Sequence, residues 1–510
     1  MAEPPKLGDL PPELFPLVAS HFPLHCTPQS LLSLGLVNLQ ISAIVLPLVP
    51  WYMILKCEND ALKMIERFFT DPALARSVRE LHIMCNLSSQ SRTAGNPVNV
   101  LTGLQDVVNA GLLPSIKFLG VTLLDGWYLD ENQKSTHQYV RLRPGFFANL
   151  QKKCPRLEGL AMKHISENKK DRWLEESGIY DMKGLLSLAL TFLNFDSDLK
   201  AFKNLSSLSQ SLCTLHISTN VLGFHASHIF SLHFPCLRSL SLENYLTNDT
   251  SQAMEFWNQH PCLEFISCTT PSSTWRFFSS EFSTNFLPNL RHLKANFLDV
   301  FSIAPILHRL VSLAILKSDN AQVPYLLRAV LPEGLPKLKS LLIAQRPASV
   351  SQPNHLESTH WYETENQRLG ENLFNSEKIS FFDNYYMHSI VRGAPNLEEL
   401  SVQGHSNCFT ALSHFVLVGP SLGELRRLQR ICLFGSKTGH MEKDLDIFLR
   451  GTRILARTCK NLKTVTDNLA LAPPFLNARI RRSDNGEVED ITIGQGFGMQ
   501  IGNENIAFPL

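Results

Sequence analysis

The sequence predicts an α/β fold in which short parallel strands alternate with helices along a right-handed solenoid, after a small helical segment. Three observations support this prediction. A short motif with apolar residues at its first, fourth and sixth positions recurs along the chain. Segments with helical patterns of apolar residues separate its copies, and the segment 1–55 lacks the motif. A regular motif of this length indicates one strand per repeat.

The motif recurs with a nearly constant period. Its six regular copies are the segments 155–162, 185–190, 212–217, 235–242, 261–268 and 288–295. Their first apolar positions are 157, 185, 212, 237, 263 and 290, so the successive intervals are 28, 27, 25, 26 and 27 residues. This period is typical of leucine-rich repeats, which span about 20–29 residues. Stacked repeats usually present a binding surface, so the pattern favours a binding protein over an enzyme.

Less regular copies extend the predicted solenoid to residues 78–478. Two early copies, at 78–83 and 114–121, are followed by the insertions 88–99 and 125–137. Later candidates are the segments 310–315, 338–343, 397–402, 428–433 and 462–465. The polar segment 345–378 contains Pro347 and Pro353 and predicts a long loop on the rim.

The N-terminal part of the chain, before the first motif copy, predicts helices. In residues 1–55, Pro11-Pro12-Glu13 predicts the start of one helix and Thr27-Pro28 the start of a second. The second helix is apolar on more than one face, so a partner surface is plausible. Residues 56–77 link this segment to the first motif copy. They predict one helix, which ends at Pro72.

The end of the chain predicts a hairpin. In residues 479–510, Asn485-Gly486 is a two-residue turn signal between segments that favour β-structure. Such a hairpin would cover the open edge of the last repeat strand.

Composition excludes several classes of function. The chain has 510 residues, and its 47 Lys and Arg nearly balance its 46 Asp and Glu, so we expect neither a nucleic-acid partner nor an anionic membrane. The apolar run at 43–55 is too short to span a bilayer, and the first residues lack a signal sequence. The 11 cysteines form no C-x-x-C pair, which indicates reduced thiols in the cytoplasm or nucleus. We expect no metal, cofactor or catalytic site.

The N-terminal segment resembles an F-box. Leu10-Pro11-Pro12-Glu13-Leu14-Phe15 fits the opening of that family's pattern, and the leucine-rich segment 31–37 fits its second helix. The match covers roughly the segment 1–50, and an F-box followed by leucine-rich repeats resembles the F-box-like proteins of mushroom-forming fungi. The resemblance implies a substrate-recognition subunit of a cullin–RING (SCF-type) ubiquitin ligase that is not itself an enzyme. By match, the residues facing its Skp-type adaptor are Leu10, Pro11, Leu14, Val18, Leu31, Leu34 and Val37.

The repeat strands predict a second surface, which would hold the protein substrate. Because strand side chains alternate between faces, the residues between the leucines project from the sheet. We expect the substrate to contact Phe265 as an aromatic anchor, with polar contacts from His216, Glu243, His292 and Lys294. Two alternatives remain open: these residues only form a solvated face, or the chain is a leucine-rich-repeat scaffold or inhibitor without any role in ubiquitination.

Overall fold

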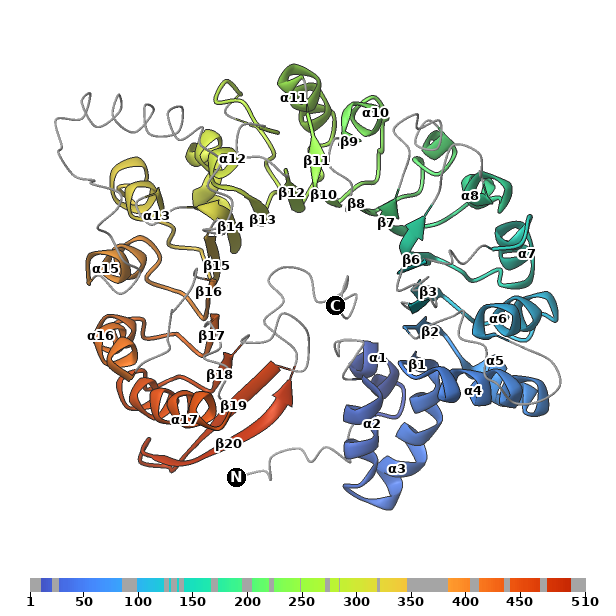
Figure 1. Ribbon diagram of the computed structural model, residues 1–510, viewed down its shortest axis with the longest axis horizontal. Helices are drawn as coiled ribbons and strands as arrows, with labels where there is room; N and C mark the ends of the chain where they lie inside the picture. The colour runs from blue at the N-terminus through green and yellow to red at the C-terminus, as the bar shows by residue number, and fades with distance from the viewer. Residues whose placement is uncertain are drawn as a thin grey trace. The chain divides into compact units, whose positions relative to one another are not determined.

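A computed structural model gives the fold of the chain (Figure 1). It describes residues 11–20, 27–84, 99–122, 128–129, 135–136, 142–166, 173–194, 204–219, 224–247, 249–270, 276–283, 285–318, 322–345, 384–403, 412–434, 441–467 and 475–496. Leu10, most of the predicted loop at 345–378 and the two early insertions therefore lie largely outside the described residues. So does the tail after Gly496.

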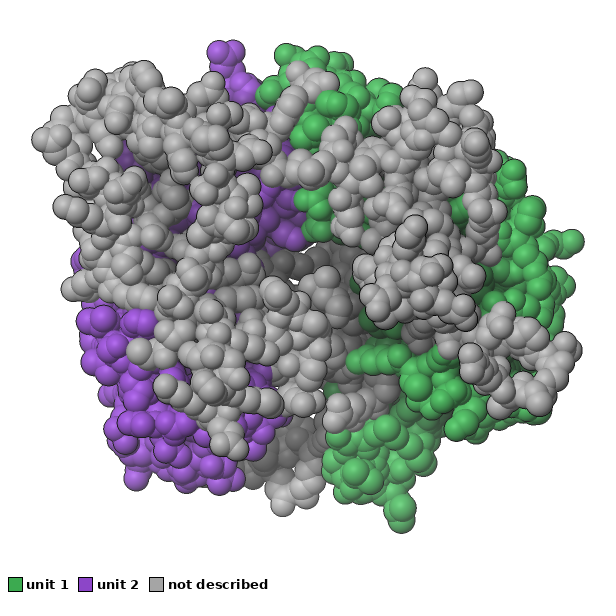
Figure 2. Space-filling view, in the orientation of Figure 1, with its two compact units in different colours: residues 1–263, 504–509 green, residues 264–503, 510 purple. Residues whose placement is uncertain are grey.

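The chain is a mixed α/β protein whose main sheet contains 16 strands, nearly all of them parallel. Contacts divide the described residues into two compact units, one ending at Leu263 and one beginning at Glu264 (Figure 2). The predicted parallel strands are confirmed, and each of the six regular motif copies forms one of them.

The first unit contributes seven strands of the main sheet. These are β1 (Tyr52–Leu55), β2 (Glu80–Ile83), β3 (Phe118–Thr122), β6 (Gly159–Ser166), β7 (Ser187–Asn194), β8 (Thr214–Thr219) and β10 (Ser239–Glu243). Each pairs in parallel with the next, as Leu188 with Leu215 and Leu215 with Leu240. The same unit contains two separate short pairs: β4 (Tyr128–Leu129) with β5 (Ser135–Thr136), and β9 (Phe224–His225) with β11 (Tyr245–Leu246).

Helical segments connect these strands and lie along one side of them (Figure 1). They are α4 (Glu58–Thr70), α5 (Pro72–Ser77), α6 (Val100–Asn109), α7 (Phe146–Lys153), α8 (Trp173–Glu176), η3 (Ile179–Asp181), η4 (Asn204–Ser207), α10 (Ser227–Phe230) and α11 (Thr250–Gln259). A buried histidine joins two successive connections: His260 Nε2 accepts from the Phe234 backbone N–H at 2.9 Å, and its Nδ1 lies 2.6 Å from the Phe256 carbonyl oxygen. The neutral imidazole, with one donor and one acceptor, satisfies both contacts.

The second unit contributes nine strands. These are β12 (Phe265–Thr269), β13 (His292–Asn296), β14 (Ser312–Ser318), β15 (Ser340–Gln345), β16 (Glu399–Gln403), β17 (Arg430–Phe434), β18 (Thr464–Asp467), β19 (Phe475–Arg482) and β20 (Val488–Gly496). Its helical segments are α12 (Phe297–Ser302), η5 (Ala304–Arg309), α13 (Gln322–Tyr325), η6 (Leu326–Val330), α15 (Asn384–Gly393), α16 (Leu412–Gly423) and α17 (Met441–Thr458). The last strands β19 and β20 form the predicted hairpin, and Gly486 adopts a positive φ of 81° in its turn. The hairpin starts at Phe475, slightly before the predicted boundary at Arg479.

The apolar positions of the motif form the core. In the six regular copies, counted from the first apolar residues at 157, 185, 212, 237, 263 and 290, none of the residues at the first, fourth and sixth positions is more than 8% exposed. This confirms the predicted strand register. Each buried leucine contributes roughly 1.5–3 kcal/mol to folding, so the repeats accumulate stability along the sheet. Among the described residues, no helix combines the length and the apolar character needed to cross a bilayer.

The N-terminal segment differs from the prediction in three places. The second predicted helix is two helices, α2 (Thr27–Gly35) and α3 (Leu39–Val45). The first ends at Gly35, and Asn38 begins the second, since its side chain accepts from the Ile41 backbone N–H at 2.8 Å. Residues 52–55 are not helical but form β1, which pairs with β2 through Tyr52 and Glu80. The predicted linking helix ends before Pro72 as expected and forms α4, but a further short helix, α5, follows it because Asp71 caps a new start at Pro72.

Candidate functional site

The helices α1 (Leu14–Ser20), α2 and α3, followed by the 3₁₀ helix at Leu46–Trp51, carry a surface of exposed aliphatic residues. The two most exposed are Leu39 at 90% and Leu36 at 88%. We call the whole set the N-terminal leucine surface: Leu14, Leu17, Val18, Leu32, Leu36, Val37, Leu39 and Leu46. Soluble proteins seldom leave so many large aliphatic side chains in water unless a partner covers them.

This surface lies in a segment that has no formal charge. Residues 14–55 contain no Asp, Glu, Lys or Arg. Beneath the surface a small core joins the helices to the first strand, and its buried members are Phe15, Ala19, Leu31, Ile41, Val45, Leu48 and Tyr52. The segment therefore buries one set of apolar residues and exposes another.

The predicted adaptor residues divide between that surface and that core. Pro11, Leu14, Val18 and Val37 are exposed, whereas Leu10 lies outside the described residues. Leu31 is only 1% exposed, and Leu34 is partly buried against the core. In this conformation Leu31 therefore stabilises the helices and offers no contact surface. The F-box match did not include Leu17, Leu32, Leu36, Leu39 or Leu46. The sequence did indicate Leu32 and Leu36, because they make the second predicted helix apolar on more than one face.

The predicted substrate residues lie on the strand face opposite the helices. In the first unit, His216 and Glu243 are half-buried, with His216 paired to Ser241 and Glu243 to Ser218. In the second unit, Phe265 pairs with His292, and their ring centroids are 6.4 Å apart. Lys294 pairs with Ser267 on the same face. The sheet therefore brings Phe265, His292 and Lys294 together as a half-buried cluster.

Several polar atoms beside this cluster have unmet hydrogen-bonding capacity. Burial lowers the pKa of His292, although the Glu264 carboxylate opposes the effect, so the ring is neutral at pH 7. Within the described part of the chain, His292 Nδ1 and the buried hydroxyls of Ser267 and Ser312 lack hydrogen-bond partners. Unpaired buried polar groups are unfavourable, and a bound ligand can supply the missing partners.

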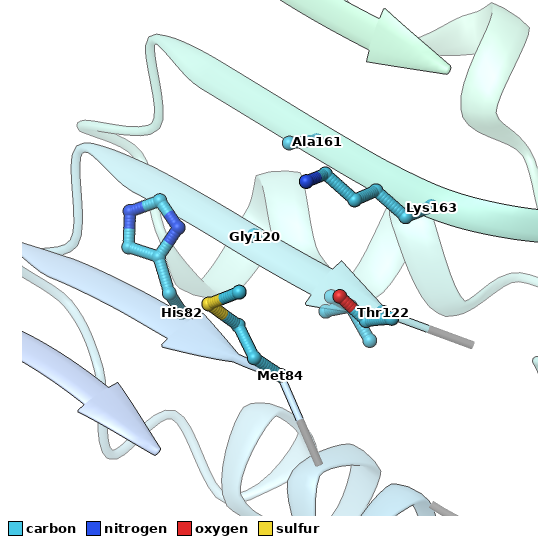
Figure 3. A pocket seen from close by; sticks show the side chains of 7 residues that line it. His82, Met84, Gly120, Thr122, Ala161 and Lys163 are labelled. Carbon is cyan, nitrogen blue, oxygen red and sulfur yellow. The ribbon is translucent and has the colours of Figure 1, made fainter. Parts of the chain in front are cut away.

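A pocket in the first unit was not anticipated. His82 of β2, Met84, Thr122 of β3 and Lys163 of β6 surround Gly120 and Ala161 (Figure 3). His82 is 3% exposed, and no described residue is a hydrogen-bond partner for its Nε2. Burial, with a smaller contribution from the Lys163 ammonium, lowers the pKa of His82 to about 3. The imidazole is therefore neutral at physiological pH.

Lys163 supplies the positive charge of this pocket. Burial lowers the pKa of its amine to about 8, against the opposing effect of the Glu243 carboxylate. It therefore remains mostly protonated at pH 7 but at an energetic cost. The sequence offered one signal for this pocket, since glycine and alanine occupy projecting positions on β3 and β6 and leave space above the sheet.

Within the described ranges, no group of three or more His, Cys, Asp or Glu residues is placed to hold a metal ion. A scan of protein-family models finds none that matches the chain, and a search of curated proteins also finds no match.

Proposed function

We propose that the chain is a substrate-recognition subunit of a cullin–RING ubiquitin ligase. In this proposal the N-terminal helices form an F-box-like domain that docks on a Skp-type adaptor, and the strands form a right-handed leucine-rich-repeat solenoid that holds a protein substrate. The observation that carries it is the uncharged N-terminal leucine surface, at the place where the sequence resembles an F-box. The cytoplasm and the nucleus are the compartments where such a ligase would act.

The chemistry of this surface fits a protein partner. Interface cores are depleted of charged residues, as is the whole segment 14–55. Leu36, Val37 and Leu39 surround the turn between α2 and α3 and project beyond the helical core, so a groove of apolar residues on the adaptor could cover them. The repeats also favour a solenoid, because equivalent leucines pair from strand to strand without a shift of register from β7 to β10.

Replacing two exposed leucines tests the adaptor contact. We expect Leu36→Ser with Leu39→Ser to weaken co-purification of the Skp-type adaptor about 30-fold or more, since central apolar contacts often contribute about 2 kcal/mol or more. The matched control is Val416→Ser with Leu417→Ser on α16, where both side chains are 56% exposed. Equal adaptor recovery with wild type and with the N-terminal variant would contradict the proposal.

The substrate contact is tested on the second unit. We expect Phe265→Ala with His292→Ala to reduce proximity labelling of substrates about tenfold or more while the proteasome is blocked, because truncating an aromatic anchor commonly costs about 1.4 kcal/mol or more. The adaptor should be recovered as before. His308→Ala, an exposed position on the helical connection η5, is the control. Unchanged labelling by the double variant would place the substrate on another part of the chain.

One observation favours a second function, a scaffold or inhibitor without a ligase role. Tyr52 of β1 belongs to the same core as Phe15, Leu31 and Ile41, so the helices also cover the first strand. A helical cap of this kind protects an exposed sheet edge without any adaptor. Failure of the full-length wild-type chain to bind the adaptor would favour this alternative.

A further inference from the structure

We infer that Cys236 and Cys262 form a redox-sensitive thiol pair, which a hydroperoxide oxidises to a reversible disulfide. Both thiols are free and exposed. Both residues belong to the first unit, so the inference depends on no contact between the two units. It goes beyond the proposed function, because it gives the chain a modification that needs neither an adaptor nor a substrate.

The two cysteines occupy the same position in two consecutive copies of the motif. Each is the third residue of a four-residue turn, and the turns are Phe234-Pro235-Cys236-Leu237 and His260-Pro261-Cys262-Leu263. In each turn the backbone N–H of the fourth residue donates to the carbonyl oxygen of the first, at 3.1 Å and 3.2 Å respectively. Proline at the second position favours such a turn. Because the turns are alike, their third side chains leave the backbone in the same direction.

A direct hydrogen bond joins the two turns. His260 Nε2 accepts from the Phe234 backbone N–H at 2.9 Å, so the first residues of the two turns are in contact. Each turn leads into a strand, and neighbouring strands of a sheet are about 4.8 Å apart. Disulfides join Cα atoms that are about 4.4–6.8 Å apart, with their Cβ atoms about 3.8 Å apart. The two surface turns therefore need to approach by only about 1 Å to form the bond.

Cysteine is an unusual residue at this position of the motif. In equivalent turns of other copies the position holds Arg156, Asn289 and Lys337, which suit a solvated site. Cysteine is among the residue types most often buried. Four other cysteines of the described ranges follow that rule: Cys154, Cys268, Cys432 and Cys459. The two exposed thiols, by contrast, can be reached by both an oxidant and a reductant.

The reaction consumes one hydroperoxide for each disulfide. The thiolate of one cysteine attacks a peroxide oxygen and breaks the O–O bond, which leaves a sulfenic acid and releases water or an alcohol. The second thiolate then attacks the sulfenic sulfur, and the sulfenic oxygen leaves as water. Two thiols thus lose two electrons and two protons, and the peroxide is reduced. A thiol reductant reverses the reaction by exchange, because exposed disulfides are labile.

Peptide mapping of the oxidised chain tests the inference. The reduced full-length chain is treated with hydrogen peroxide, the remaining thiols are alkylated, and the product is digested with trypsin and Glu-C without reductant. This digestion places Cys262 on the peptide 256–264 and Cys236 on the peptide 204–238. At about 10 µM protein, we expect these peptides to become linked about 100-fold faster than peptides of different chains, because neighbouring thiols have an effective concentration of about 1 mM or more. Dithiothreitol should remove the link.

Serine variants distinguish this pair from the other thiols. Cys236→Ser and Cys262→Ser should each abolish the link. Cys213 shares the peptide 204–238 with Cys236, so Cys213→Ser decides which of the two is linked, and this variant should keep the link. Cys57→Ser removes an exposed thiol elsewhere in the first unit and is the matched control.

Each outcome supports or overturns the inference. A link within one chain that needs both Cys236 and Cys262, and that persists in the Cys213→Ser variant, supports it. A link of either cysteine to another thiol, or a link only between chains, would overturn it. So would the absence of a link at peroxide concentrations that oxidise the exposed thiol of Cys57. Failure of the ligase proposal would leave these results unaffected, because the assay contains only this chain.

Discussion

Leu240→Asp should unfold the first unit of the chain. Leu240 is completely buried on β10 and pairs with Leu215, which is also completely buried. The exchange removes the burial of a leucine, which costs roughly 2–5 kcal/mol, and buries an unpaired carboxylate at a cost of several kcal/mol more. Domains are stable by only about 5–15 kcal/mol, so the sum removes most or all of the stability. Circular dichroism during a urea titration measures the effect.

A second exchange of the same kind is the control. Leu36→Asp introduces the same carboxylate at a leucine that is 88% exposed, so it should leave the urea midpoint nearly unchanged. A Leu240→Asp protein that unfolds at the wild-type urea concentration would show that Leu240 does not face the core. The register of β8 and β10 would then need revision.

Asp299→Asn should change the pH dependence of the second unit's stability. Burial raises the pKa of Asp299 to about 7, although hydrogen bonds from the Phe277 and Phe278 backbone N–H groups and the charge of Arg276 oppose the effect. The folded chain therefore keeps this proton to a higher pH than the unfolded chain, whose Asp pKa is about 3.9. The contribution of the protonated carboxyl group to the free energy of unfolding is fully present below pH 4. It is lost as the pH rises through about 7, and the loss is on the order of 4 kcal/mol.

The asparagine variant isolates this contribution because its amide does not titrate. Its side-chain oxygen can still accept from the Phe277 and Phe278 backbone N–H groups, so the local contacts persist. We expect the free energy of unfolding of the wild type, minus that of the variant, to fall between about pH 4 and pH 7 and to level off at higher pH. Asp446→Asn, on the exposed face of α17, should leave the wild-type dependence unchanged. A wild type and an Asp299→Asn variant with parallel pH profiles would contradict the prediction.

The candidate surfaces were predictable to different degrees. The alternation of side chains along a strand was enough to place Phe265, His292 and Lys294 on one face, and the strand pairing brings the three together. The N-terminal segment was less predictable, because α2 ends at Gly35 and Asn38 begins α3. This break leaves Leu36, Val37 and Leu39 outside the core while Leu31 is buried within it.

The sequence by itself determined the repeat, its strand register and the terminal hairpin. These features depend on local signals, namely a constant interval between leucines, the two-residue alternation of a strand and the Asn485-Gly486 turn. Only the tertiary structure decided which polar side chains meet. His82 and Lys163 are far apart in the sequence, and they line one pocket because β3 lies between β2 and β6 with a glycine at the crossing position. Burial of these groups, and hence their pKa values, depends on neighbouring strands that local sequence does not specify.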